Sequence, residues 1–174
     1  MFISLMKEHK IFTLFLIFLL ISGFFIGVYE FRMREFHEKT MLDYTFSEAI
    51  YQNSLVYEKV NFNDIADFEW SQLLLIRSYM NPRQVFEDEG LRWQNIRTSI
   101  KYHDGITLIV FLYDNQIVAF RDHSREMGDF LADGNTHLIR YGYSIFDRKD
   151  ANFGAQFNRG DRMKLIHRSY AVDS

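Results

Sequence analysis

The sequence predicts an α+β protein: an N-terminal transmembrane helix, then a small domain with an antiparallel sheet of about five strands and one or two packed helices. Three observations lead to this prediction. Residues 11–29 are apolar and carry no charge. Several runs of β-branched and aromatic residues follow, bounded by turn residues. Only one or two helical patterns lie among these runs, which favours an antiparallel sheet over alternating strand–helix units.

The composition excludes several classes of protein. Of the 174 residues, 48% are hydrophobic and 17% are aromatic, so the chain has enough apolar surface to form a core. It has no Cys, which excludes disulfides, Cys-ligated metals and thiol nucleophiles. The net charge of −3 provides no positive field for nucleic acid, so no nucleic-acid partner is expected. No cofactor is expected either, because the chain has no phosphate loop or dinucleotide fingerprint.

Residues 11–29 are predicted to cross a lipid bilayer. At about 1.5 Å per residue, a helix of this length measures about 28 Å, close to the thickness of the hydrocarbon core. A cleaved signal peptide is one alternative, but its apolar region usually runs about 7–15 residues and ends at a pair of small residues. A buried soluble helix is another, but such helices are rarely apolar on all sides over this length. We therefore expect an uncleaved anchor.

The expected organisation has four parts: a cytoplasmic tail (residues 1–10), the span (11–29), a juxtamembrane segment (30–40) and an extracytoplasmic α+β domain (41–174). Lys and Arg residues are nearly balanced across the span, with two before it and three within residues 30–40. The positive-inside rule therefore does not decide the orientation. The short tail favours an N-terminus on the cytoplasmic side of a bacterial cytoplasmic membrane and a domain on the opposite side. The reverse orientation stays open.

The first elements of the domain follow from local patterns. Apolar residues recur at helical spacing around Phe46 and Ile50, so a helix is expected to continue from the span or to restart near Asp43. Residues 55–62 are rich in β-formers. Residues 69–79 form an apolar run that is typical of a strand buried on both faces.

A short helix is expected next, over residues 83–89. Asn81 and Pro82 suit its start, and Gly90 suits its end. A strand is then expected over residues 93–100. The three residues from His103 to Gly105 form a turn signal that ends this part of the chain.

Residues 106–121 are expected to form a β-hairpin. Two runs of β-branched and aromatic residues flank Asp114 and Asn115, which tolerate the positive φ angles of a tight hairpin turn. Beyond the hairpin, a turn is expected at 133–135. Strands are expected at 137–146 and 162–169, and a polar loop at 148–160 connects them.

One set of residues resembles a known group of proteins. The set comprises Asp67, Phe68, Glu69, Trp70, residues 73–76, Tyr79, Pro82, Gly90, Asp104, Gly105 and residues 106–120. Its order is similar to that of small uncharacterised bacterial envelope proteins, either lipoproteins or membrane-anchored. This chain departs from the pattern at Met80 and Asn81, which separate Tyr79 from Pro82, and in lacking a lipid-modified Cys. The resemblance implies an envelope location and no catalytic residue.

No catalytic or metal-binding residue is predicted. The six histidines form no His-x-His or His-Glu-x-x-His pair. A site assembled from distant residues stays open, with ligands from His103, His123, His137 and nearby Asp or Glu. The consecutive Asp122, His123 and Ser124 contain triad residue types, but neighbours in a strand point to opposite faces.

The predicted binding surface lies in the polar loop 148–160. It comprises Arg148, Phe153, Phe157 and Arg159, because aromatic residues and Arg are enriched in contact surfaces. The alternative is that both Phe side chains pack under the sheet.

The function expected is therefore that of a membrane-anchored envelope protein with a non-catalytic, protein-binding or accessory domain. Two alternatives stay open. One is a membrane-attached hydrolase or metal-dependent enzyme that uses dispersed His and Asp. The other is a lipid- or cell-wall-binding domain that uses the aromatic and Arg residues of the loop.

Overall fold

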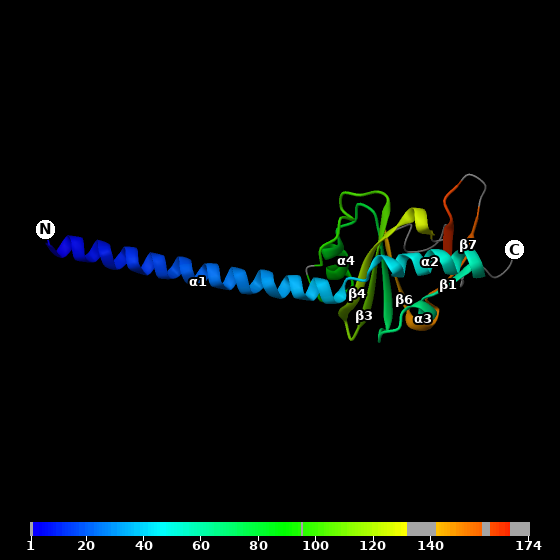
Figure 1. Ribbon diagram of the computed structural model, residues 1–174, viewed down its shortest axis with the longest axis horizontal. Coiled ribbons are helices and arrows are strands. Elements are labelled where there is room, and N and C mark those ends of the chain that lie inside the picture. The colour runs from blue at the N-terminus through cyan, green and yellow to red at the C-terminus, as the bar shows by residue number, and fades with distance from the viewer. Residues whose placement is uncertain (1, 95, 132–141, 158–160, 168–174) are drawn as a thin grey trace. The chain divides into compact units, whose positions relative to one another are not determined.

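The computed structural model describes residues 2–94, 96–131, 142–157 and 161–167, with the side chains of residues 2–11 and 131 left aside. The chain divides into two compact units, Met1–Lys39 and Thr40–Ser174 (Figure 1). The first is a single helix and the second is a mixed α+β domain.

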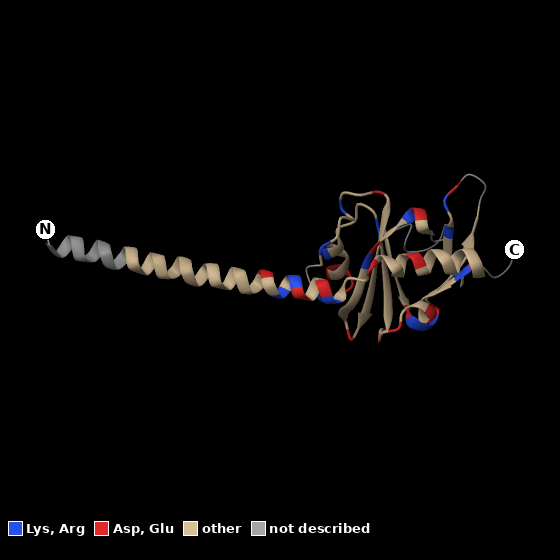
Figure 2. Ribbon diagram, in the orientation of Figure 1, with Lys and Arg blue, Asp and Glu red and all other residues tan. Residues whose placement is uncertain are grey.

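Helix α1 (Phe2–Thr40) is one continuous helix of 39 residues. Figure 2 shows that its described part carries no charged side chain before Glu30. The large apolar side chains of this stretch, such as Phe12, Leu19 and Phe25, are exposed. By length and composition, α1 is therefore suited to be a membrane span or a signal sequence.

The helix also continues past the expected span into residues 30–40. Two ion pairs lie on this part, Arg34 with Glu38 and Lys39 with Glu35, and the partners in each pair are one helical turn apart. Pairs of this spacing give weak support to an exposed helix.

The described residues of the domain form two four-stranded sheets, which corrects the expectation of one sheet of about five strands. The first sheet has the order β4-β3-β2-β6, and all its pairs are antiparallel. Its strands are β2 (Gln72–Arg77), β3 (Ile106–Tyr113), β4 (Gln116–Ser124) and β6 (Tyr143–Asp147).

The second sheet has the order β1-β7-β8-β5. Its strands are β1 (Lys59–Asn61), β5 (Asp129–Leu131), β7 (Asn152–Gln156) and β8 (Lys164–His167). β5 and β8 run parallel, while the other pairs are antiparallel.

The main core joins both sheets to α2 (Tyr44–Tyr57) and to the short helix α3 (Phe62–Ile65). Side chains alternate along a strand, so Leu73, Leu75 and Phe111 face this core while their neighbours face away. Aromatic rings fill much of its volume. Phe62 meets Phe111 and Phe153 edge-on, at centroid distances of 5.8 and 5.7 Å.

The opposite face of β2 and β3 is buried too, as expected from their apolar runs. Leu74, Ile76 and Val110 have no exposed surface. Helix α4 (Pro82–Asp88) contributes the buried Val85 and Phe86. The start of α4 after Asn81 and the positive φ of Gly90 confirm the helix signals of the sequence.

The strand expected at 93–100 does not form in the described residues. In place of the backbone pairs of a strand, hydrogen bonds between a side chain and a backbone N–H join this segment to β4. The Gln94 side chain accepts a hydrogen bond from the Ile117 N–H at 2.7 Å, and Asp122 accepts from the Ser99 N–H at 3.0 Å. The segment is therefore bound to the edge strand β4 without extending the sheet.

The hairpin of β3 and β4 is confirmed, with φ of 50° at Asp114 and 58° at Asn115. The restart of a helix near Asp43 is confirmed as α2, but α2 runs to Tyr57, so residues 55–57 are helical and only Lys59–Asn61 form a strand. β6 and β8 confirm parts of the last two expected strands. The expected turn at 133–135 lies outside the described residues.

Candidate functional site

The predicted binding surface does not exist as one exposed loop. Residues 148–157 form a 3₁₀ turn, η2 (Arg148–Asp150), and then β7. Phe153 is only 2% exposed and belongs to the core, which corrects its assignment to a surface, because strand alternation turns it inward. Phe157 is exposed, and Arg159 lies outside the described residues.

Arg148 is held by contacts within the domain. Its Nε donates a hydrogen bond to Asn63 Oδ1 at 2.7 Å, and an Nη donates to the Trp70 carbonyl at 3.4 Å. These bonds fix the guanidinium against the end of the first sheet. The arrangement is that of a structural arginine.

The histidines proposed as dispersed ligands do not come together in the described part of the chain. His103 is exposed in a turn, where its Nδ1 accepts a hydrogen bond from the Gly105 N–H at 3.2 Å. His123 is buried in β4, and His137 lies outside the described residues. No group of three or more His, Asp or Glu among the residues described is arranged to hold a metal ion.

Among the described residues, His123 is a buried titratable group with a large pKa shift. Its Nδ1 lies 3.1 Å from Ser47 Oγ and its Nε2 lies 3.1 Å from the Gly128 carbonyl oxygen. Burial lowers the pKa of His123 from 6.5 to about 4. The imidazole is thus neutral at pH 7 and links α2 to the end of β4, a structural role.

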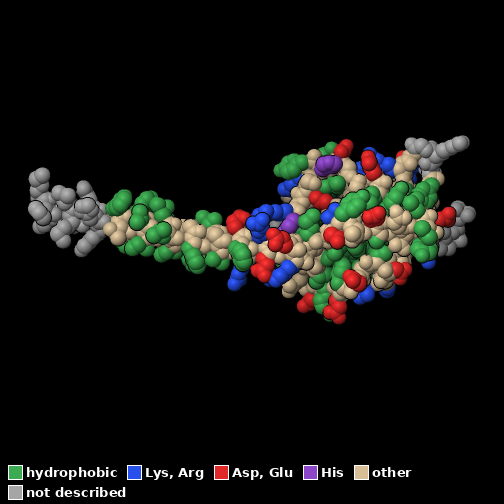
Figure 3. Space-filling model, viewed as in Figure 1, with side chains coloured by type: hydrophobic (Ala, Val, Ile, Leu, Met, Phe, Trp, Pro, Cys, Tyr) green, Lys and Arg blue, Asp and Glu red, His purple; other side chains and the backbone are tan. Residues whose placement is uncertain are grey.

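An exposed apolar surface lies at the C-terminal end of α2. Leu55, Val56 and Tyr57 are consecutive, and their side chains are 44%, 65% and 62% exposed. We call these three residues the α2 apolar end. Figure 3 shows hydrophobic side chains on the face of the domain that carries α2. The sequence interpretation missed this surface because residues 55–62 are rich in β-formers, which gave no sign that a helix continues to Tyr57.

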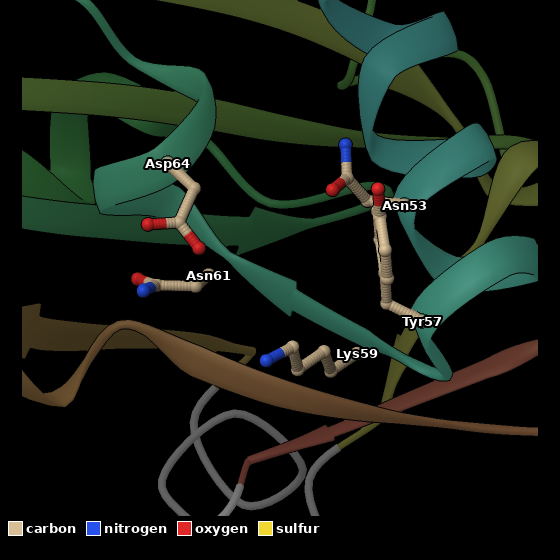
Figure 4. A pocket seen from close by; sticks show the side chains of 5 residues that line it. All are labelled: Asn53, Tyr57, Lys59, Asn61 and Asp64. Carbon is tan, nitrogen blue, oxygen red and sulfur yellow. The ribbon is translucent and has the colours of Figure 1, made fainter.

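A polar hollow of about 300 Å³ lies beside the α2 apolar end. It is open to solvent and is lined by residues from three elements: Asn53, Tyr57, Lys59, Asn61 and Asp64 (Figure 4). Asn53 and Tyr57 are four residues apart on α2, so they share one face of the helix. Lys59 and Asn61 flank the buried Val60 in β1, so alternation turns both outward.

Two local features of the backbone bring α2, β1 and α3 together around this hollow. Glu58 ends α2 in the left-handed conformation, with φ of 51°, and the chain turns directly into β1. Asn61 Oδ1 accepts hydrogen bonds from the backbone N–H and the side-chain amide of Asn63, at 3.0 and 3.2 Å. The Asn61 cap starts α3 and brings Asp64 to the hollow.

Comparison with family models, with curated proteins and with solved structures found no match for this chain. The resemblance to envelope proteins therefore remains an expectation from the sequence.

Proposed function

We propose that this chain is a single-pass membrane protein whose C-terminal domain is a non-catalytic module that binds another protein. The observation that carries the proposal is the α2 apolar end, presented on a domain that follows a helix suited to span a membrane. The anchor is uncleaved and lies in a bacterial cytoplasmic membrane, with the N-terminus on the cytoplasmic side.

The charge-free part of α1 supports the anchor. A helix whose apolar side chains are exposed on all sides is stable where lipid surrounds it. A tether also raises the local concentration of the domain at the membrane, so a weak protein contact becomes effective there.

The α2 apolar end supports binding of a protein. Runs of three or more exposed apolar residues are unfavourable on a soluble domain unless they serve a function. Tyr is enriched in protein interfaces, and interfaces have an apolar centre with a polar rim. The exposed and charged Glu58 and Lys59 follow the run directly in the chain.

Membrane fractionation tests the anchor. The full chain should stay in the membrane after a carbonate wash. Leu19→Lys places a charge near the centre of the span, costs about 3 kcal/mol of insertion free energy and should release part of the chain. Glu38→Lys changes a charge outside the span and should have no effect. A mature N-terminus within residues 23–30 would instead show cleavage.

A reporter fusion tests the orientation separately. Alkaline phosphatase fused after residue 174 should be active if the domain lies outside the cytoplasm. Activity only from a cytoplasmic reporter would reverse the topology and leave the protein-binding proposal intact.

Site-specific photocrosslinking tests the binding surface. A photoreactive residue at position 56 in the full chain, in native membranes, should give an adduct of defined mass, whereas the same residue at exposed Glu48 on α2 should not. An excess of detergent-solubilised full chain should compete for the adduct, and its Val56→Asp variant should not. Equal adducts from both positions, or equal competition by both chains, would contradict the proposal.

A further inference from the structure

We propose that the polar hollow between α2, β1 and α3 is a binding site for a neutral saccharide. The site overlaps the α2 apolar end at Tyr57, while Leu55 and Val56 do not line it. Its volume of about 300 Å³ lies at the lower limit of ligand pockets, which suits one or two sugar rings better than a larger ligand.

The hydrogen-bonding groups of the hollow match a polyhydroxyl ligand. A hydroxyl group both donates and accepts, so it needs donors and acceptors side by side. The Asn61 oxygen is already bonded to Asn63, which leaves its NH₂ group as a donor to the hollow. The Asn53 NH₂ group donates to the Ala49 carbonyl at 2.8 Å, which leaves its oxygen as an acceptor.

Figure 4 shows how these groups are placed. The Lys59 side chain runs along β1 toward Asn61, and the Asp64 carboxylate lies on the other side of Asn61. The Asn53 oxygen and the Tyr57 hydroxyl lie together on the facing side, from α2. Donors and acceptors therefore converge on one space from two walls.

The charges of the hollow favour a neutral ligand. Lys59 contributes one positive charge and Asp64 one negative charge, so the lining has no net charge. Among the described residues neither group has an ion-pair partner, which leaves both for a ligand. A phosphate would meet the carboxylate, and a metal cation would meet the ammonium group.

Tyr57 provides the apolar part of the site. Its side chain is 62% exposed, so the ring offers surface to the C–H face of a sugar, and its hydroxyl adds a hydrogen-bonding group. The remaining lining residues are polar, so a purely apolar ligand would leave their polar atoms without partners.

Ligand-detected NMR on the full chain tests the proposal, in a detergent that contains no sugar. The probes are maltose, cellobiose and chitobiose, with the dipeptide Ala-Ala and inorganic phosphate as rival ligands. At least one disaccharide should bind with a Kd of about 1 mM, typical of a small open site with few contacts. Tyr57→Ala and Asp64→Ala should each weaken this binding about tenfold or more.

Val56→Asp is the matched control, because this neighbouring residue is exposed and does not line the hollow. It should leave saccharide binding unchanged, while it abolishes competition in the photocrosslinking experiment. Far-UV circular dichroism should show that every variant is folded. Absence of disaccharide binding at 20-fold above the expected Kd, preferential binding of Ala-Ala or phosphate, or an equal loss in Val56→Asp would overturn the proposal.

Discussion

The guanidinium group of Arg148 lies over the indole ring of Trp70, with its Cζ atom 5.3 Å from the ring centroid. Trp70 is buried and meets the Phe111 ring edge-on at 5.1 Å. Arg148 lies in η2, the turn that connects β6 of the first sheet to β7 of the second. The contact with Trp70 therefore packs this turn against the aromatic core. Arg148, which was expected to face a partner, is exposed and also packs over the edge of the core through Trp70.

Replacement of Arg148 should destabilise the domain. Arg148→Ala removes the stacking on Trp70 and the bond to Asn63, and should lower the free energy of unfolding by about 1–2 kcal/mol. Lys149→Ala, at the exposed neighbouring position, should have almost no effect. Urea denaturation of the solubilised chain measures the stability of both variants. Equal unfolding midpoints for Arg148→Ala and Lys149→Ala would contradict the structural role of Arg148.

Acid should destabilise the domain through His123. The unfolded chain binds a proton at His123 below pH 6.5, whereas the folded chain does so only near the depressed pKa of about 4. The free energy of unfolding should therefore fall as the pH drops from 6.5 to 4, by up to about 3 kcal/mol from this group. Arg121 opposes its protonation and Asp129 favours it.

Variants separate this contribution from that of other groups. His123→Gln should flatten the dependence of the unfolding midpoint on pH between 6.5 and 4. His103→Ala, which alters an exposed histidine, should leave the dependence as it is. A wild-type slope in His123→Gln would mean that His123 does not control the acid response.

A charge at the centre of β3 should prevent folding. Val110 has no exposed surface, and its neighbours across the sheet are Leu74 and Phe120. Val110→Asp would bury a carboxylate without a partner, so no cooperative unfolding transition should be seen. Tyr113→Asp, at the 47% exposed end of the same strand, should still fold. Cooperative melting of Val110→Asp near the wild-type temperature would show that β3 is peripheral.

The hairpin turn offers a change in the opposite direction. Asn115 has φ of 58°, and Gly adopts this conformation without strain. Asn115→Gly should raise the free energy of unfolding by about 0.5 kcal/mol, and Asn115→Ala should lower it. Thermal denaturation of the two variants gives the sign of each change, and the reverse order would argue against a turn with two left-handed residues.

The sequence predicted elements whose signals are local. Asp114 and Asn115 between two apolar runs were enough to predict the hairpin, and Asn81, Pro82 and Gly90 were enough for α4. The run from Leu73 to Ile76 also showed correctly that β2 is buried on both faces. In each case the determining residues are adjacent in the chain.

Apart from β8, which lies in the strand expected at 162–169, the second sheet could not be predicted in this way. Its strands are three to five residues long, and β7 contains Gly and polar residues that resemble a loop. β7 is a strand because β1, more than 90 positions earlier, and β8 both pair with it. Pairing between distant segments leaves little trace in local composition.

The candidate hollow was missed for a related reason. Its residues come from the end of α2, from β1 and from α3, whereas the sequence interpretation noted only that residues 55–62 are rich in β-formers. The helical spacing of Phe46, Ile50 and Ser54 does extend to the end of α2, since all three are buried and Ser54 Oγ donates to the Ile50 carbonyl at 2.7 Å. A buried Ser is a weaker signal than a buried Leu, so the pattern appeared to stop at Ile50.

The place of β8 within its sheet has a consequence for biosynthesis. β8 is the last described strand in the chain, yet it lies between β5 and β7 and not at an edge. While a ribosome is still making residues 164–167, β5 and β7 have no strand to join them, and the apolar side chains of Phe130 and Phe153 lack part of their enclosure. The domain should therefore close only after these residues emerge, which leaves a nascent intermediate with open strand edges for chaperones to protect.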